Sequence, residues 1–414
     1  MNLFAPTSEE AFKKGGVDQK NYIYKLRIIK ALFRNQQHTV NEISRYLGTS
    51  LPTTHTLMQQ LIDSTLVRKE GFAKSSGGRK AELYQLLPDA FYILSIAITK
   101  FRVRLTLFNT AREAVSPTHQ FVLKLDDERE TAMQLVREIK QFLAGQALPE
   151  QRIIAAGLSM PGLIDAAAGK NFTYLNFSDE PLTDFLEERI GLPVYLENDA
   201  RAMTLAEYHF QPNTASHVLG IFVGWGIGIG IVVDGKVYHG FKGFAGEFSH
   251  APLFDSSEVN CACGKKGCLE AVASGTAAVR LAEEAIKHDP DSILAKISAR
   301  NGHFLEPASI VEAAKAGDQR TIRILSQIGL DLGKGIAILI QLLNPEKIIV
   351  GGVLSEAGDY LFTPIQQALN IYSMPISKQG VQLVPGKFGD AVGPLGAVAA
   401  AQEKLFSPIV PTGF

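Results

Sequence analysis

The sequence predicts two parts: a small α+β domain over residues 1–88 and a two-lobed α/β domain over residues 89–414. Length is the first reason, because 414 residues exceed a single domain of about 100–200 residues. Charge is the second reason. Residues 1–88 carry 13 Lys and Arg against 7 Asp and Glu, a balance of +6, so the remainder carries −7 of the net −1. The third is the order of expected helices and strands given below.

A basic first part attached to an acidic second part suggests that the first part meets a polyanion. The remaining composition, with 46% hydrophobic and 20% charged residues, is typical of soluble globular proteins. No uninterrupted apolar run reaches the roughly 18–20 residues that a membrane span needs. The N-terminus also lacks the apolar core of a signal peptide. We therefore expect a cytoplasmic protein without membrane insertion.

Three short helices are expected in the first part. Apolar residues within 21–34 recur at helical spacing. A second helix begins at Thr39, because Thr39 and Glu42 have the spacing of a capping box, and Gly48 supplies the turn that ends it. A third helix covers residues 50–63. Two helices joined by a glycine turn predict a helix-turn-helix, whose second helix enters the DNA major groove.

The third helix should turn one face to the core and the other to solvent. Small hydroxyl and amide side chains on the solvent face suit contacts with phosphates and base edges. The expected DNA contacts on this face are Thr53, His55, Thr56 and Gln59.

A wing is expected after the third helix. Residues 66–72 and 82–86 alternate like strands, and the loop between them is basic and rich in glycine. Arg79 and Lys80 in this loop are the expected contacts with a minor groove or with phosphates. Three-helix units also serve as protein-interaction modules, and a basic loop is often only a solvated hairpin. Helix pattern, wing and charge together favour DNA binding, which makes this a winged helix-turn-helix.

The second part alternates strands and helices. Strands are expected at about 91–98, 102–109, 120–125, 153–158 and 193–197, as a pair within 218–233 that turns at Asp234-Gly235, and at 347–350. Helices are expected at about 127–145, 200–210 and 394–404, with a mainly helical stretch after the cysteines. This order predicts two lobes, the first from residues 89–199 with the C-terminal helix at about 394–405, and the second from residues 200–393. Side chains at strand C-terminal ends would line a cleft between the lobes.

The chain has only three cysteines, Cys261, Cys263 and Cys268, all within eight residues. An odd, clustered set is a poor disulfide framework and a plausible metal site. Zinc takes four ligands in a tetrahedron, so a fourth ligand must come from elsewhere in the chain. The alternative is three free cysteines in a loop.

Several motifs of the second part carry a family resemblance. They are Gly224-Trp225-Gly226-Ile227-Gly228-Ile229-Gly230, Gly246-Glu247-Phe248-Ser249-His250, the cysteine stretch 261–270, and Asn344-Pro345 with Gly351-Gly352. Together they resemble the ROK family of repressors, open reading frames and sugar kinases. With the winged helix-turn-helix in front, the chain is similar to the xylose and N-acetylglucosamine repressor branch. The resemblance implies an actin-like, sugar-kinase-like (ribonuclease H-like) fold for residues 89–414.

The resemblance also implies ligand-binding residues. It assigns His250 as the fourth ligand of a structural Zn²⁺ beside Cys261, Cys263 and Cys268, in a zinc motif at 250–268. It places the sugar contacts at Asn198, Asp199, Glu247, His250 and Glu270. In the kinases of the family the aspartate matching Asp199 is the general base, which here would be vestigial. Glu197, just before this set, is interpreted as a strand-end carboxylate.

Kinase chemistry is not expected, because the phosphate-binding turn differs from that of the family's kinases. Those enzymes resemble one another in an Asp-x-Gly-Gly-Thr turn, where this sequence has Ala97-Ile98-Thr99-Lys100-Phe101. The turn thus lacks the acidic residue for Mg²⁺ and both glycines that let backbone approach phosphate. In the second phosphate loop, Trp225 and Ile229 replace smaller residues. The alternative is a glucokinase-like sugar kinase with an accessory DNA-binding head.

The expected function is a repressor of carbohydrate metabolism genes that responds to a sugar or sugar phosphate. A homodimer, or a dimer of dimers, would bind double-stranded operator DNA with two recognition helices in successive major grooves. Some members of the family are controlled by a regulatory protein, which is the alternative to a small-molecule effector. An activator would use the same parts, and a purely structural zinc protein is disfavoured by the carboxylate set.

Overall fold

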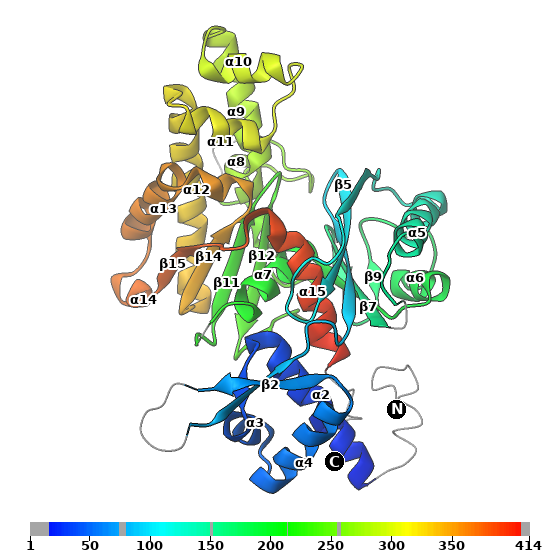
Figure 1. Cartoon of the computed structure of the whole chain (residues 1–414). Coiled ribbons are helices and arrows are strands. Elements are labelled where there is room, and N and C mark those ends of the chain that lie inside the picture. Colours follow the sequence, from blue (N-terminus) through cyan, green and yellow to red (C-terminus); the bar gives the residue numbers. More distant parts are fainter. Residues whose placement is uncertain (1–15, 74–79, 150–151, 213, 255–257, 407–414) are drawn as a thin grey trace. The chain divides into compact units, whose positions relative to one another are not determined.

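The computed structural model describes residues 16–73, 80–149, 152–212, 214–254 and 258–406 (Figure 1). These residues fall into two units. The first contains the described residues up to Ala202, together with His209–Pro212 and those from Gly393 onward. The second contains Met203–Tyr208 and the described residues from 214 to Val392. The predicted first part and the predicted first lobe thus belong to the same unit.

The N-terminal part of the first unit is a three-helix fold with a small antiparallel sheet. Its elements are α2 (Val17–Asn35), β1 (His38–Thr39), α3 (Val40–Leu47), α4 (Leu51–Asp63), β2 (Val67–Phe72) and β3 (Glu82–Leu86), with strand order β1-β3-β2. Ile29, Phe33, Ile43 and Leu61 are almost fully buried between the helices. The first helix begins four residues before the predicted start, and the two-residue strand β1 was not predicted.

A five-stranded sheet forms the remaining core of the first unit. Its strands are β4 (Tyr92–Ile98), β5 (Arg102–Asn109), β6 (His119–Val122), β7 (Ile153–Met160) and β10 (Val194–Asn198), in the order β10-β7-β4-β5-β6. Strands β10, β7 and β4 are parallel, and β5 and β6 are antiparallel to their neighbours. The other elements are the hairpin of β8 (Ile164–Asp165) and β9 (Lys170–Asn171), and helices α5 (Arg129–Ala144), α6 (Leu182–Ile190) and α15 (Val392–Leu405). Helix α15 packs closely on β7, since a Cβ added at Gly157 would lie 1.9 Å from the Ala397 carbonyl oxygen.

The second unit repeats the same sheet topology. Its strands are β11 (Val218–Val223), β12 (Ile227–Val233), β13 (Lys236–Val237), β14 (Lys347–Gly351) and β15 (Gln382–Pro385), in the order β13-β12-β11-β14-β15. Its helices are α8 (Leu269–Ala273), α9 (Gly275–His288), α10 (Ile293–Arg300), α11 (Pro307–Lys315), α12 (Gln319–Leu343), α13 (Asp359–Tyr372) and α14 (Pro375–Lys378), with 3₁₀ turns η2 (Glu247–His250), η3 (Val353–Ala357) and η4 (Gly389–Ala391). Each sheet has its first strand in the centre, two antiparallel strands on one side and two parallel strands on the other. Helix α7 (Asp199–His209) begins and ends in the first unit, while its middle belongs to the second.

The strand pair within 218–233 turns at a different place from the one predicted. Gly224-Trp225-Gly226 connects β11 to β12, whereas Asp234-Gly235 connects β12 to the short strand β13. Asp234 (φ 51°) and Gly235 (φ 73°) both have left-handed backbone, as a two-residue hairpin turn requires. Asp234-Gly235 therefore does form a turn, but this turn joins β12 to β13 and not β11 to β12.

Helix α12 is long and apolar enough to cross a membrane by length and composition. It is instead a core helix of the second unit, because 56% of its most apolar window is buried and Leu325, Ile328 and Leu332 have no exposed surface. Gly329 and Gly333 let α13 approach closely, since an added Cβ at Gly333 would lie 2.6 Å from that of Ala368.

Candidate functional site

The helix-turn-helix is built by local capping interactions. The hydroxyl of Thr39 accepts from the amide of Glu42 (3.3 Å), and the carboxylate of Glu42 accepts from the amide of Thr39 (2.7 Å). Gly48 adopts left-handed backbone (φ 66°) and ends α3. Ser50 then caps α4 by accepting from the amide of Thr53 (3.4 Å). The predicted capping box, glycine turn and third-helix start are all confirmed.

The solvent face of α4 carries the predicted DNA contacts. Thr54, Leu57, Met58 and Leu61 are buried, while Thr53, His55, Thr56 and Gln59 are exposed. Some of these side chains also bond within the helix: the Thr56 hydroxyl donates to the Pro52 carbonyl (3.1 Å), and the Gln59 amide donates to Asp63 (2.8 Å). Nucleic acid would have to share or replace these local bonds.

The wing is present as the antiparallel pair β2 and β3. Gly71 (φ 106°) lies where the pairing register shifts, so the strand bulges just before the loop. Lys80 is exposed at the start of the returning chain, and Arg79 lies outside the described residues. Lys69 on β2 pairs with Glu82 (3.0 Å), which reduces the positive charge that it offers to a partner.

A metal-ligand group lies in the second unit. The ligand atoms of His250, Cys261 and Cys263 all lie within 4.8 Å of one another. Nδ1 of His250 lies 3.4 Å from Sγ of Cys261, and the Cys263 and Cys268 sulfurs are 3.7 Å apart. A tetrahedral ion with Zn–S bonds of about 2.3 Å places two sulfurs about 3.7 Å apart. The structure thus brings three of the predicted ligands, His250, Cys261 and Cys263, into one group, whereas Cys268 is close to Cys263 but is not a member of that group.

A tight backbone knuckle places the three cysteines. The Cys261 amide donates to the Lys265 carbonyl (2.7 Å), and the Gly264 amide donates back to Cys261 (3.0 Å). Gly264 (φ 88°) and Gly267 (φ 70°) both need left-handed backbone, and a Cβ at Gly267 would lie 2.3 Å from the Phe254 carbonyl oxygen. The glycines of this motif are thus required for its shape.

The predicted sugar contacts divide between the two units. Glu247, His250 and Glu270 belong to the second unit, where His250 lies 3.9 Å from each carboxylate. The Glu270 carboxylate accepts from the amide of Ile227 (3.0 Å) at the start of β12. Gly226 leaves room for that carboxylate, because an added Cβ would lie 2.6 Å from Glu270 Oε2. The glycine loop and the acidic side chain therefore depend on each other.

Asn198 and Asp199 belong to the first unit, at the junction of β10 and α7. Oδ1 of Asn198 accepts from the amides of Ala200 (3.1 Å) and Arg201 (3.2 Å), and its amide group donates to the Gly162 carbonyl (3.3 Å). Asn198 is thus held by its own helix start and by the loop after β7.

Sequence reasoning missed a buried ion pair directly behind these residues. Arg201 Nε donates to Glu197 Oε1 (2.7 Å), and both side chains are 3% exposed or less. Glu197 also accepts from the Asn198 amide (2.9 Å), while Arg201 donates to the Ile164 carbonyl (3.1 Å). Glu197 does lie at the end of β10, as interpreted, and the structure adds that its carboxylate is buried in an ion pair. No local pattern points to this pair, because Glu197 lies in β10 and Arg201 in α7.

The two segments compared with the phosphate loops of the family's kinases each connect a pair of antiparallel strands, β4 to β5 and β11 to β12. Ala97 is buried in β4, and Thr99, Lys100 and Phe101 form an exposed hairpin closed by Thr99 donating to the Arg102 carbonyl (2.8 Å). In the other loop, the Gly224 amide donates to the Gly226 carbonyl (3.0 Å). The loop is thus held by its own backbone.

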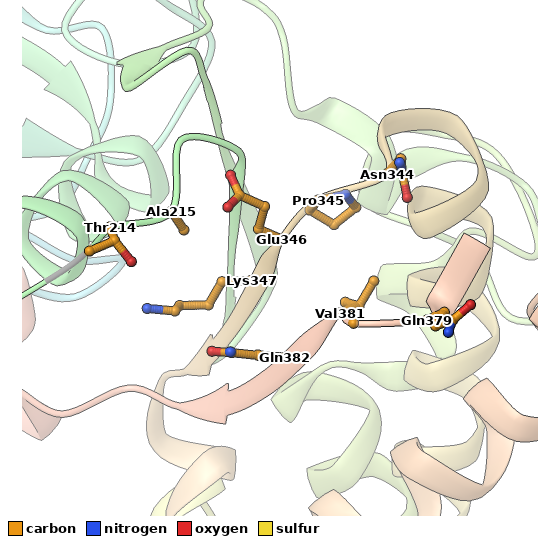
Figure 2. A pocket seen from close by; sticks show the side chains of 10 residues that line it. Thr214, Ala215, Asn344, Pro345, Glu346, Lys347, Gln379, Val381 and Gln382 are labelled. Atoms are coloured by element: carbon orange, nitrogen blue, oxygen red, sulfur yellow. The ribbon is translucent and has the colours of Figure 1, made fainter. Parts of the chain in front are cut away.

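A cavity of about 290 Å³ lies elsewhere in the second unit, where β14 and β15 begin. Figure 2 shows the side chains of Thr214, Lys347 and Gln382 facing the same hollow. None of the predicted sugar contacts lines it. Asn344 of the Asn-Pro motif lies at its edge with left-handed backbone (φ 43°), which ends α12. That motif is thus explained by helix termination.

A family model described as "ROK family" matches residues 94–404, and a model described as "IclR helix-turn-helix domain" matches residues 26–71. The chain is 27% identical to a xylose repressor of Caldicellulosiruptor bescii over 93% of this chain and 96% of the relative. It is 33% identical to a glucokinase of Halalkalibacterium halodurans over 75% of this chain and 94% of the relative.

The similar solved structures likewise include a transcriptional regulator and a glucokinase. The crystal structure of a ROK family transcriptional regulator, a homologue of the Escherichia coli MLC protein, matches with a TM-score of 0.77 at 26% identity, covering 94% of this chain and 97% of that one. A ROK family glucokinase from Streptomyces griseus, solved with glucose and AMPPNP, matches with a TM-score of 0.65 at 27% identity, covering 75% of this chain and 99% of that one. The xylose repressor and the regulator structure thus match 93% and 94% of the chain, and these two glucokinases each match 75% of it.

Proposed function

Because the chain belongs to the ROK family, we propose that it is a sugar-responsive transcriptional repressor of carbohydrate metabolism genes. A single observation carries this proposal: a complete helix-turn-helix with an exposed polar second helix precedes the ROK domain in one chain. The relative named as a xylose repressor matches over 93% of the chain, which includes this head, whereas the glucokinase match extends over 75%.

In this proposal, residues 1–88 bind double-stranded operator DNA and residues 89–414 bind the effector. Helix α4 would enter the major groove with Thr53, His55, Thr56 and Gln59, and the wing with Arg79 and Lys80 would contact the minor groove or phosphates. A homodimer, or a dimer of dimers, would read a two-fold symmetric site. Binding to the chromosome implies a cytoplasmic protein.

DNA binding is tested in two steps with the full chain. Bound sequences are first selected from a random duplex library, and their affinity is then measured by fluorescence anisotropy. We expect the double variant Thr56→Ala/Gln59→Ala to lose at least about tenfold in affinity, because each good base contact contributes about 1–3 kcal/mol. Gln141→Ala, an equally exposed change on α5, should bind like the wild type. Absence of any sequence-selective duplex binding by the wild type would refute the proposal.

The proposed effector is a sugar or sugar phosphate, held by Asn198, Asp199, Glu247, His250 and Glu270. Carboxylates and amides suit this ligand because each can bond to paired hydroxyl groups. The ligand would favour an arrangement different from the one that DNA favours, so that binding one weakens binding of the other. Thermal-shift screening of xylose, glucose, N-acetylglucosamine and the hexose 6-phosphates would identify it, since a ligand of the native state raises Tm.

A regulatory protein partner replaces the small molecule in this scheme if no sugar changes DNA affinity. The two modes are separated by adding purified sugars to the DNA complex: release by a sugar alone supports the small-molecule mode. Release only by cell extract, and not by any sugar, would move control to a protein.

We also propose that His250, Cys261, Cys263 and Cys268 bind one structural Zn²⁺. Four protein ligands leave no position for a water, so the ion would fix the loop that carries Glu247 and Glu270 and would take no part in chemistry. Nδ1 of His250 lies nearest the sulfur of Cys261, which leaves Nε2 as the atom for a sugar hydroxyl.

Zinc content tests this proposal directly. We expect about one zinc per chain by elemental analysis, and loss of the zinc together with a lower Tm in Cys268→Ser. Lys265→Ser changes an exposed residue of the same knuckle that donates no ligand atom, and should retain both. Zinc-free protein with an unchanged Tm would eliminate the site.

Sugar kinase activity is the second candidate function, favoured by the match to a glucokinase at 33% identity. We propose that this activity is absent, because Ala97, Thr99, Lys100 and Phe101 stand where the family's kinases have an acidic residue, two glycines and a hydroxyl residue, and the side chain of Ala97 is buried. The vestigial base would be Asp199. Sugar-dependent ADP release that Asp199→Asn abolishes would show instead that the chain is a kinase.

A further inference from the structure

Two consecutive residues near the end of α15 bind opposite parts of the first unit. Glu403 contacts α2 of the helix-turn-helix, and Lys404 contacts the strand β10 that leads to Asn198. All the contacts described in this subsection lie within the first unit.

The contacts of Glu403 form a dense charged cluster. Its carboxylate accepts from Lys30 Nζ (2.9 Å) and from Arg34, and its main-chain carbonyl accepts from Lys30 (3.1 Å). His209, the last residue of α7, places Nε2 3.2 Å from the same carboxylate and 3.1 Å from Arg34. Lys30 and His209 are both buried.

An aromatic cluster also joins α2 to the rest of the first unit. The ring of Phe33 on α2 lies 6.0 Å from Phe91, 6.0 Å from Phe210 and 6.3 Å from Phe406, measured between ring centroids. Arg112 stacks on Phe210 and donates to the Arg34 carbonyl (3.0 Å). Because apolar packing of this kind is dense, we expect the helix-turn-helix to move together with the rest of the first unit.

Lys404 contacts the part of the first unit that carries Asn198. Its ammonium donates to the carbonyls of Leu196 (3.3 Å) and Ala166. Leu196 precedes Asn198 by two residues in β10, and Ala166 follows the loop that Asn198 and Arg201 hold through the Gly162 and Ile164 carbonyls. Burial lowers the pKa of Lys404, while the charges of Glu197 and Asp165 oppose that change.

We propose that the Glu403–Lys404 pair couples the Asn198–Asp199 end of the effector site to helix α2 of the DNA-binding head. This proposal rests on the proposed function and names the residues through which it is regulated. A change at the end of β10 alters the carbonyls that Lys404 binds, and the adjacent Glu403 passes the displacement to Lys30 and Arg34. Helix α7 joins the same two places, because it begins at Asp199 and ends at His209.

Physical coupling without a ligand is the first test. In the full chain, Lys30→Met removes a contact on the head, and we expect faster amide hydrogen exchange in residues 162–166 and 194–198. Lys20→Met, an exposed change on the same helix, should leave these amides unchanged. Identical exchange in Lys30→Met and wild type would overturn the connection, whether or not the chain is a repressor.

The second test measures coupling through the ligand. Allosteric coupling is typically about 5- to 150-fold in affinity. With whichever of xylose, glucose, N-acetylglucosamine or the hexose 6-phosphates binds the wild type, we expect Lys404→Met and Glu403→Gln each to bind sugar and DNA while the ratio of DNA affinities without and with sugar falls to about one. Arg137→Met, which breaks an exposed ion pair on α5, should retain the full ratio.

The two tests distinguish the possible failures. Folded variants that bind both ligands with an unchanged ratio overturn the coupling pair and leave the repressor function standing. A wild type that binds no operator or no effector refutes the proposed function, and the exchange experiment then decides the connection alone. If Lys404→Met does not fold, Lys404→Arg retains the charge with altered geometry and is expected to give an intermediate ratio.

Discussion

At the scale of single residues, the site depends on small groups that leave room for larger ones. Gly226 is the clearest case, because its missing side chain is the space that Glu270 occupies. Gly224 lies two residues away in the same loop, and a Cβ there would meet nothing within 4 Å. These two glycines therefore form a matched pair for experiment.

We expect Gly226→Ala to weaken binding of the effector sugar by at least about tenfold, which corresponds to about 1.4 kcal/mol. The added methyl group would displace the Glu270 carboxylate and break its bond to the Ile227 amide. Titration calorimetry measures the affinity, and Gly224→Ala should match the wild type. Equal weakening by both substitutions would show that the loop tolerates no alanine for reasons unrelated to Glu270.

At the scale of elements, the helix-turn-helix depends on local capping and not on length. Helix α3 has only eight residues, which is too short for intrinsic helical stability. Its capping box satisfies two backbone amides and fixes where the chain enters the helix. The orientation of α4 relative to α2 follows from this start.

Thr39→Ala should destabilise the protein by about 0.5–2 kcal/mol and weaken DNA binding in parallel, because an uncapped α3 no longer supports α4. Thr39→Ser retains the accepting hydroxyl and should behave nearly like the wild type. Urea denaturation followed by circular dichroism gives the stability. An unchanged unfolding midpoint in Thr39→Ala would mean that tertiary packing alone defines the helix start.

At the scale of the whole chain, buried charges hold the head to the rest of the first unit. Burial, opposed by Glu403 and reinforced by Arg34 and Lys30, lowers the pKa of His209 from 6.5 to about 4. His209 is therefore neutral at pH 7 in the folded chain, with Nε2 3.1 Å from Arg34 and 3.2 Å from Glu403. Burial alone would raise the pKa of Glu403, but the bond from His209 and the charges of Arg34 and Lys30 hold it below its ordinary value.

These shifts predict acid sensitivity of the head attachment. Between pH 6.5 and about 4 the unfolded chain binds a proton at His209 that the folded chain does not, so stability rises with pH across this window. Below about pH 4.5 protonation of the unfolded Glu403 adds a loss of the same sign. We expect a loss of at most about 3 kcal/mol from His209 on acidification from pH 6.5 to 4.

Thermal unfolding between pH 7 and 4.5 measures this loss. His209→Gln cannot titrate and should flatten the pH dependence of Tm, even if it lowers Tm at pH 7. His288→Gln removes an exposed histidine of α9 and should leave the slope as it is in the wild type. A slope unaffected by His209→Gln would place the acid-sensitive group elsewhere.

The sequence alone determined the features that depend on neighbours along the chain. Capping residues, the glycine turn of the helix-turn-helix, the apolar faces of α2 and α4, most strands and the cysteine spacing are local patterns. Each is set by backbone geometry or periodicity within a few residues. The short strand β15 was not predicted, because its four residues carry little periodicity. Helix α6 was missed although Leu182, Phe185 and Leu186 have helical spacing and are buried.

Only the tertiary structure decided which distant residues meet. Glu403 lies 373 residues from Lys30 in the sequence, yet its Oε1 lies 2.9 Å from Lys30 Nζ. No local sequence pattern around either residue predicts this pair. The buried role of Glu197 likewise depends on strands β7 and β10 enclosing it, and the room for Glu270 depends on a glycine 44 positions earlier. Local sequence fixes elements because their energetics are local, whereas burial and long-range charge pairing exist only after the elements have packed.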